Sequence, residues 1–398
     1  MKTISLDPPT LRAWWWHRQG LDGSLSGAAS ADVLRRAGWA RSVGGASPYL
    51  TLHARAGIGR SSADAAVAAL EIHELPAARG CTYVVPAEDF PVALLAGPRT
   101  DSEMATARKL GVTEAEVDRL AAAVLDALAR GPLDPADIKR AVGGACRDLG
   151  ADGAKKGIAS TLPLALGRLQ AEGAIRRVPP NGRLDQQRYR YTRWDPSPLA
   201  GVTMTQEEVH VELARRYFRW IGPARLSEFQ WFSGLSAKAA KAATAPLRLA
   251  ALGDDGEWLV LQEDAEALAS FRPPREPQYA LVSSLDAISL LRRDLPGLLD
   301  ARDLSRQVMA DKATRDLGGL TDLPSHAILD RGRLVGLWEY DPETSTIAWC
   351  SFGGKNKALA AAVARTETFV RDELGDARAF SLDSPKSRAG RIAALRGM

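Results

Sequence analysis

Cysteine and long apolar runs are what this chain most lacks. Its three cysteines, Cys81, Cys146 and Cys350, lie far apart, and none has a C-x-x-C spacing. This argues against a disulfide framework or a thiolate zinc site and fits packing residues in a reducing cytoplasm. The first nine residues contain no apolar leader, and no run of about 20 uninterrupted apolar residues occurs anywhere. We therefore expect a cytoplasmic protein that is neither secreted nor membrane-spanning.

Motifs for nucleotide, cofactor and metal chemistry are lacking as well. The sequence contains no Walker loop, no G-x-G-x-x-G after a strand, no H-E-x-x-H and no deaminase H-x-E with P-C-x-x-C. The histidines are isolated from one another: His17, His53, His73, His210 and His326. We assign none of them to a metal site and expect neither a cofactor nor a metal ion.

Positive charge, by contrast, is concentrated in one segment. Residues 136–194 carry twelve basic and five acidic side chains, a net charge of +7, whereas the whole chain of 398 residues carries +4 and the remainder −3. Such a concentration suits a polyanion, which releases counterions on binding, while thinly spread charge serves mainly solubility. The alternative is a solvated basic face without a ligand, so the surrounding pattern has to decide.

That segment lies in a unit with the element order of a winged helix. An amphipathic helix over 114–130 is followed by a helix over 136–142 and by a third between Thr161, which can cap it, and Gly173. The third helix occupies the recognition-helix position. Its apolar face is formed by Leu162, Leu166 and Leu169.

Two strand-forming runs, 175–178 and 187–192, flank a Pro-Pro-Asn-Gly turn and predict the wing. Arg188 and Arg190 are two residues apart on a strand, so they would share one face and could clamp phosphate, unless acidic neighbours pair with both. The side chains that we expect to contact DNA are Lys155, Lys156, Arg168, Arg176, Arg177, Arg183, Arg188 and Arg190.

The same order of elements occurs on both sides of this unit. Before it, helices over 11–20, 31–37 and 63–70 and a loop over 38–49 precede a strand over 80–85. The first of these helices carries Trp14, Trp15 and Trp16, which can pack in a core or stack on bases, and core packing is the more common use.

After the central unit, a capping box at Thr205 and Glu208 opens a helix over 209–221. Helices over 226–232 and 237–245 and a hairpin over 247–262 complete a third copy. Because its wing is acidic, we expect this copy to be structural or to touch DNA only through its helix.

The last part of the chain reads as β-rich. Strands are predicted over 280–282, 325–329, 334–340 and 346–352, followed by a helix over 356–374. The basic tail 385–391 could track phosphate but more commonly such a tail is frayed and solvated. We therefore predict an α+β protein with three tandem winged-helix domains and a β-rich domain, bounded as 1–105, 106–198, 199–272 and 273–398.

Five motifs resemble those of the bacterial AlkZ/YcaQ-like family of winged-helix DNA glycosylases, which release alkylated or crosslinked bases. In order along the chain they are Arg18–Gly23, Pro48–Arg55, Ala78–Asp89, Leu285–Asp294 and Gly332–Trp338. The resemblance covers most of the chain. It implies three winged helices that form a concave surface, followed by a C-terminal β-barrel-like domain with a terminal helix.

The resemblance also implies a catalytic Gln-x-Gln or Gln-x-Asp motif just before the Pro48 motif. This chain has Trp39-Ala-Arg-Ser-Val43 there. Depending on a one-residue gap, the two motif positions hold Arg41 and Val43, or Ala40 and Ser42, and neither pair can position water as two amides or an amide and a carboxylate would. The nearby histidine of the family corresponds to Tyr83.

Two readings follow from this departure. Either other residues have taken over base release, or the protein binds DNA without this chemistry. The catalytic candidates are Arg41, Ser42, Tyr83 and Asp286, each of which has a plain structural use as well. Arg41 suits a phosphate or an uncharged lesion better than a cationic base, because like charges repel.

The sequence therefore predicts a DNA-repair protein of the glycosylase-like class that binds damaged double-stranded DNA as a nucleoid-associated monomer. The first alternative is a non-catalytic winged-helix DNA-binding protein with a regulatory or architectural role. A second is a protein-interaction scaffold built on winged helices.

Overall fold

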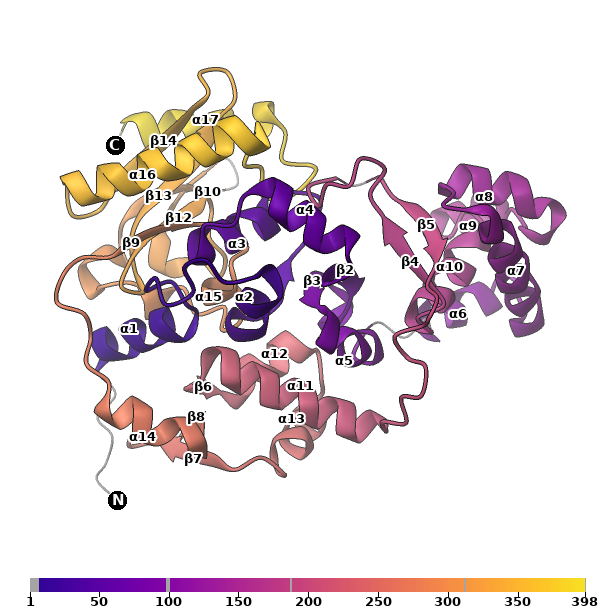
Figure 1. Ribbon diagram of the computed structural model, residues 1–398, viewed down its shortest axis with the longest axis horizontal. Helices are drawn as coiled ribbons and strands as arrows, with labels where there is room; N and C mark the ends of the chain where they lie inside the picture. Colours follow the sequence, from indigo (N-terminus) through magenta and orange to yellow (C-terminus); the bar gives the residue numbers. More distant parts are fainter. Residues whose placement is uncertain (1–6, 98–100, 187, 311–312, 398) are drawn as a thin grey trace.

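The computed structural model describes residues 7–97, 101–186, 188–310 and 313–397, which form four successive parts (Figure 1). We call them unit 1 (7–97), unit 2 (101–194), unit 3 (205–270) and the C-terminal part (279–397). Helices and small antiparallel sheets occur along the whole chain, which confirms the α+β class. Residues 1–6, part of the N-terminal segment discussed above, and Gln187, where the second wing strand was predicted to begin, lie outside the described residues.

Unit 1 combines helices with a three-stranded sheet. Its elements are α1 (Pro8–Arg18), α2 (Ser30–Ala37), β1 (Ala40–Arg41), α3 (Ser47–Ala56), α4 (Arg60–Ala68), β2 (Ile72–Pro76), η1 (Ala78–Gly80), β3 (Thr82–Pro86), η2 (Ala87–Asp89) and α5 (Phe90–Leu95). The strands are antiparallel in the order β1-β3-β2. The predicted loop over 38–49 was partly wrong, because Pro48 lies in the first turn of α3, where its missing N–H costs little.

Unit 2 follows the predicted order of elements. They are α6 (Asp101–Arg108), α7 (Glu114–Ala127), η3 (Leu128–Arg130), α8 (Pro135–Val142), η4 (Gly143–Ala145), α9 (Gly150–Lys155), α10 (Leu162–Ala171), β4 (Ile175–Val178) and β5 (Arg190–Arg193). A bridge between Leu133 and Tyr191 adds a third partner to the β4–β5 pair. Thr161 stands at the N-cap of α10, but its hydroxyl accepts from the Arg147 N–H at 3.0 Å and does not cap the helix.

Unit 3 has the same order of elements as the segment from α2 to β3 in unit 1. It comprises α11 (Gln206–Ile221), β6 (Ala224–Arg225), α12 (Leu226–Ser233), α13 (Ala237–Thr244), β7 (Leu249–Leu252), β8 (Trp258–Leu261) and α14 (Gln262–Ser270). Its sheet order, β6-β8-β7, matches β1-β3-β2. The predicted capping box is confirmed: the Thr205 N–H donates to Glu208 at 2.8 Å, and the Glu208 N–H donates to Thr205 at 3.2 Å.

The C-terminal part is built on an open sheet. Its elements are β9 (Tyr279–Val282), α15 (Ala287–Leu290), η5 (Pro296–Leu298), η6 (Ala301–Asp303), β10 (Gln307–Ala310), β11 (Ala313–Asp316), η7 (Leu317–Gly319), β12 (His326–Asp330), β13 (Arg333–Asp341), β14 (Thr346–Ser351), α16 (Lys357–Phe369), the π-helical turn η8 (Val370–Leu374) and α17 (Pro385–Gly397). The main sheet has the order β14-β13-β12-β9. The barrel-like shape was wrong for the described strands, because helices packed on this sheet bury its apolar side chains without closure.

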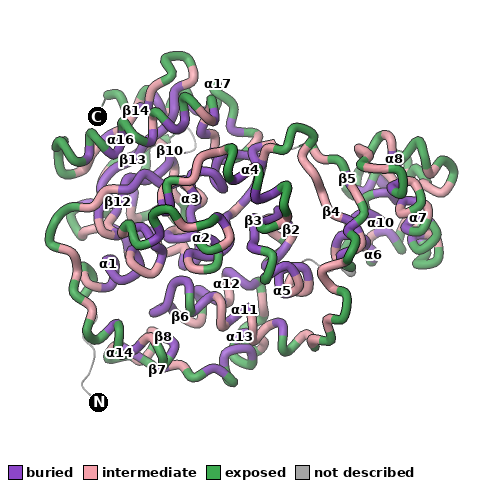
Figure 2. Tube along the Cα trace, viewed as in Figure 1, coloured by how far each residue is buried: buried purple, intermediate pink, exposed green. Residues whose placement is uncertain are grey.

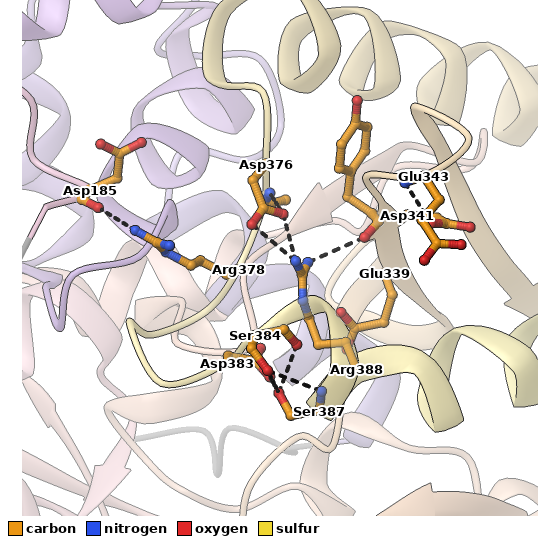
Figure 3. Close-up of polar contacts among 12 residues, drawn as sticks. Asp185, Glu339, Asp341, Glu343, Asp376, Arg378, Asp383, Ser384, Ser387 and Arg388 are labelled. Carbon is orange, nitrogen blue, oxygen red and sulfur yellow. Dashed lines mark hydrogen bonds and ion pairs between the residues drawn. The ribbon is translucent and has the colours of Figure 1, made fainter.

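The basic tail is ordered, and the expectation of a frayed terminus was wrong. It forms α17, which packs against β13 and β14. The Arg388 side chain is fully buried and donates to Asp376 at 3.0 Å (Figure 3). It also donates to the Tyr340 carbonyl at 3.2 Å. Arg391 lies 2.7 Å from Glu339. The arginines of this tail are therefore used to dock the helix.

The sheet of unit 1 separates two apolar cores, which lie in the centre of the molecule (Figure 2). Tyr83 and Val85 belong to the core shared with unit 3, whereas Ala40 and Val84 belong to the core shared with β12, β13 and α16. Trp14, Trp15 and Trp16 are buried in the first core, which confirms core packing. Unit 2 has a third core of its own and is set to one side of the molecule (Figure 1).

Candidate functional site

Strand β1 sends neighbouring side chains to opposite sides of the unit 1 sheet, as the strand period of two requires. Arg41 lies opposite Tyr83 of β3 on one side. On the other side, the buried Ser42 hydroxyl donates a hydrogen bond to the Glu74 carboxylate of β2. The two adjacent candidates Arg41 and Ser42 therefore face different surroundings.

The loop after β1 is fixed by backbone contacts with the C-terminal part. The Ser381 N–H donates to the Val43 carbonyl at 3.2 Å, and the Ala46 N–H donates to the Arg378 carbonyl at 2.8 Å. Gly45 is required at this crossing, because a Cβ there would lie 2.2 Å from the Ala379 carbonyl oxygen. Arg378 also reaches from this segment to the Asp185 backbone at 3.1 Å (Figure 3).

A cavity of about 230 Å³ opens beside Arg41, at the junction of unit 1, unit 3 and the C-terminal part. Its lining residues are Trp39, Arg41, Arg79, Cys81, Tyr83, Trp231, Phe232, Leu285, Ala287, Leu290, Leu291, Arg293 and Asp322. Ligand sites occur preferentially at such junctions, and the volume is smaller than the roughly 300–1,000 Å³ typical of drug-sized ligands. Neither α1 nor its three tryptophans contributes to the lining. We call this space the Arg41 cavity.

Three arginines lie against aromatic rings of the Arg41 cavity. The Arg41 guanidinium carbon is 5.4 Å from the Tyr83 ring centroid, and Arg41 donates to the Thr82 carbonyl at 2.7 Å. The guanidinium carbons of Arg79 and Arg293 lie 4.3 and 4.9 Å from the Trp231 centroid. Arg293 is also paired with Asp322, at 2.8 Å. Three positive side chains and one negative side chain leave the lining with a net charge of +2.

Two of these arginines hold strained backbone conformations. Arg79 has φ 58° and Arg293 has φ 52°, in the left-handed region that favours glycine. Such conformations persist where the surrounding structure imposes them, and they concentrate at ligand sites. Gly234 contributes at Arg79, because a Cβ at Gly234 would lie 3.1 Å from the Arg79 Cγ. Sequence reasoning missed both arginines, since only folding brings three arginines of distant segments to one cavity.

Sequence reasoning also missed Glu74, the buried carboxylate behind β1. Burial raises the pKa of Glu74, and hydrogen bonds from Ser42 and Tyr189 partly oppose the rise. Tyr189 lies between the wing strands of unit 2, where the Arg177 guanidinium stands 5.3 Å from its ring centroid. Glu74 therefore connects β1 and β2 to the wing. The only signal in the sequence was a pair of polar residues, His73-Glu74, inside a short strand.

The candidate Asp286 lies apart from the Arg41 cavity lining. Its side chain is 0% exposed and accepts two hydrogen bonds from Arg55, at 2.7 and 2.8 Å. It also caps α15 by accepting from the Ile288 N–H at 3.1 Å. Tyr83, by contrast, lines the cavity beside Arg41. The structure therefore brings two of the four catalytic candidates together.

The predicted DNA-contacting side chains fall into three groups. Lys155, Lys156, Arg188 and Arg190 are exposed, and no ion pair of theirs occurs among the described residues. Arg188 precedes β5, so it does not share a regular strand with Arg190.

Arg176 and Arg177 are half-buried on β4, where unit 2 meets unit 1, and burial lowers the pKa of Arg176. Arg168 and Arg183 make ion pairs within the protein. Arg168 contacts Glu114 and Asp118 of α7, and Arg183 contacts Asp185.

The structure also shows the surroundings of side chains that commonly bind metal ions, the histidines among them. In the described ranges, no group of three or more His, Cys, Asp or Glu side chains is placed to hold a metal ion. His73 is packed edge-on against Trp194 and Phe90, with centroid distances of 5.4 and 6.3 Å. No described helix has both the length and the apolar character that crossing a membrane requires.

Comparison with known proteins decides the family. A family model described as "DNA glycosylase AlkZ-like" matches residues 35–369. The chain belongs to the AlkZ-like DNA glycosylase family. A search of curated proteins gave no match.

Among solved structures, the DNA glycosylase AlkZ of Streptomyces sahachiroi is similar to this AlkZ-like chain. The TM-score is 0.67 at 20% sequence identity, over 95% of this chain and 99% of that one. At this level of identity the likeness shows a common fold. Within that fold, Arg41 of the AlkZ-like chain lines a cavity. Arg41 belongs to the segment in which the family resemblance implies a catalytic amide.

Proposed function

We propose that this protein binds damaged double-stranded DNA, carrying alkylated or crosslinked bases, and releases the damaged base by N-glycosidic hydrolysis in the Arg41 cavity. The observation that carries the proposal is the position of that cavity, which opens at β1 where the family resemblance implies the catalytic loop. A base must leave the duplex stack to be released, and a small cavity at the junction of several units suits a single extruded base.

The three units with recurring element order are proposed as winged helices, and unit 2 as the main DNA anchor. Its four exposed cations are Lys155, Lys156, Arg188 and Arg190. Arg176 and Arg177 lie at the inner edge of this set, while Arg168 and Arg183 support it through their ion pairs. Each lost phosphate contact reduces the steepness of the plot of log binding constant against log salt concentration by about 0.9. The number of phosphate contacts made by unit 2 can therefore be measured.

The test replaces the four exposed cations of unit 2 by glutamine. We expect weaker binding to an undamaged duplex and a shallower dependence of the binding constant on salt. The matched control replaces Lys357 of α16 and Lys386 of α17, which are also exposed but belong to the C-terminal part. An unchanged slope in the unit 2 variant would refute the DNA anchor.

A base-release assay tests the enzymatic part of the proposal. Duplexes that carry N7- or N3-alkylpurines, O6-alkylguanine or an interstrand crosslink are incubated with excess protein, and free base is measured. Release from any of them supports glycosylase activity. Binding without release would favour the alternative, a non-catalytic DNA-binding protein. The loss of the family's polar pair, whether its positions hold Arg41 and Val43 or Ala40 and Ser42, supports that alternative.

A further inference from the structure

We infer that the Arg41 cavity selects an uncharged alkylated purine that retains its N7 acceptor, such as an O6-alkylguanine, over a cationic N7- or N3-alkylpurine. This inference rests on the proposed function, since it assumes that the cavity receives an extruded base. Its basis is the charge and the arrangement of the side chains around the cavity.

Electrostatics is the first reason. The guanidinium groups of Arg41, Arg79 and Arg293 line the cavity, and the single lining carboxylate, Asp322, is already engaged by Arg293. Glu74, which also acts on Arg41, lies behind the sheet and is bonded to Ser42 and Tyr189. A cationic base entering this space meets a lining of net positive charge. Because Arg79 and Asp322 are exposed, solvent screens part of this repulsion, which still opposes a cation at the short distances inside the cavity.

The aromatic rings give a second reason. Aromatic faces attract cations, and a box of open rings would favour a cationic base. Here arginine covers two of the four aromatic rings in the lining: Arg41 covers Tyr83, and Arg79 and Arg293 cover Trp231, while Trp39 and Phe232 are the other two rings. The cations that these faces attract are thus supplied by the protein itself. Arg41 uses one guanidinium nitrogen for the Thr82 carbonyl, and Arg293 uses two for Asp322. The remaining guanidinium N–H groups are donors of the kind that pairs with purine N7 and O6 in DNA.

The chemistry of departure gives a third reason. When the N-glycosidic bond breaks, its electron pair stays on the base nitrogen. A cationic alkylpurine then leaves as a neutral molecule, whereas an uncharged purine leaves as an anion that takes up a proton. Water adds its hydroxyl group to C1′ and supplies that proton. Guanidinium groups placed at the developing negative charge favour the second departure and do nothing for the first.

The experiment compares two methylguanine lesions that differ in charge and in the position of the methyl group. Duplexes carry either O6-methylguanine or N7-methylguanine at one site, both on 2′-fluoro sugars that slow base loss, and an undamaged duplex sets the baseline. We expect the wild-type protein to bind the O6-methylguanine duplex at least about tenfold more tightly than the N7-methylguanine duplex, a difference of about 1.4 kcal/mol.

Variants of Arg41 separate charge from shape. Arg41→Gln lowers the net charge of the lining from +2 to +1 and should reduce the affinity ratio of the two lesions severalfold, whereas Arg41→Lys, which keeps the charge, should retain discrimination against the cationic lesion. Lys357→Gln on α16 serves as the matched control and should leave the ratio unchanged.

The outcomes separate the inference from the proposed function. A wild-type preference for N7-methylguanine, or a ratio that Arg41→Gln leaves unchanged, overturns the inference while duplex binding and base release sustain the proposed function. If no duplex binds at low salt, the proposed function fails and the inference fails with it.

Discussion

At the scale of single residues, strand alternation decides what the departure from the family motif means. Arg41 points into the cavity, and Ser42 points to buried Glu74. The two possible alignments of the catalytic motif, one that includes Arg41 and one that includes Ser42, therefore place the motif in different surroundings. The period of two could be applied to the sequence, but which side holds a cavity could not be predicted. That depends on Trp231 and Arg293, which belong to distant parts of the chain.

His73 should make the protein sensitive to acid. Burial, and secondarily Arg176, lowers the pKa of His73 to about 3. Because its folded-state pKa lies below the unfolded value near 6.5, its contribution to stability is complete above pH 6.5 and is lost as pH falls toward 3. Between pH 7 and pH 5 this costs about 2 kcal/mol of unfolding free energy.

The test is His73→Phe, which keeps an aromatic ring beside Trp194 and removes the titration. Denaturant unfolding at pH 7 and pH 5 should show a smaller loss of stability in the variant than in the wild type. An equal loss in both proteins would contradict the role assigned to His73.

Asp286 should matter for stability whatever its part in catalysis. Asp286→Asn leaves the fully buried Arg55 without its counter-charge, and breaking a buried pair costs about 3–5 kcal/mol. Thermal unfolding measures this loss. The matched control is Asp254→Asn at the exposed β7–β8 turn, where a change within about 0.5 kcal/mol is expected. A stable Asp286→Asn protein that has lost only activity would point to a direct role in chemistry.

At the scale of elements, the sequence predicted the helices well where caps and periodicity agreed. Thr205 and Glu208 marked α11, and the leucines at 162, 166 and 169 marked α10. It failed at α3, since glycines on both sides of Ser42 suggested a continuous loop, and at α17. The arginines of α17 look like those of a solvated tail until their partners on β13 and the 376–383 segment are known.

Arg388 should hold the 376–384 segment against the loop after β1. Arg388→Met removes the buried partner of Asp376 and should lower stability by about 3 kcal/mol. Hydrogen exchange at residues 43–46 should rise, because their backbone partners at 378–381 lose support. Lys386→Met, an exposed position on the same helix, is the control. Unaltered exchange at 43–46 in Arg388→Met would show that the two segments are independent.

At the scale of the whole molecule, unit 2 has fewer unpaired positive charges than the net charge of +7 counted over residues 136–194 suggests. Six of the twelve cations in residues 136–194 form ion pairs within the described chain: Lys139, Arg140, Arg147, Arg168, Arg183 and Arg193. Several of their partners, such as Glu114 and Asp126, lie on α7, outside that window. A count along the chain cannot include partners that only folding brings near. The net positive charge left for DNA is therefore confined to fewer side chains.

Unit 2 should also lose stability independently of the other parts, because its core is separate. Leu120→Ala on α7 opens a cavity in that core and should cost about 2–5 kcal/mol. Faster hydrogen exchange should appear mainly in residues 101–193. Leu213→Ala on α11, which is equally buried in the core shared by units 1 and 3, should show the reverse pattern. If hydrogen exchange became faster throughout the chain in both variants, the molecule would unfold as a single cooperative unit.

The pairing of residues 43–46 with residues 378–381 has a consequence for biosynthesis. The loop at residues 43–46 is synthesised more than 330 residues before the segment at 378–381 that supports it. At translation rates of about 5–20 residues per second, the loop waits roughly 17–67 s for its partner. A nascent chain can therefore display the cationic unit 2 before the loop beside the Arg41 cavity has its backbone partners.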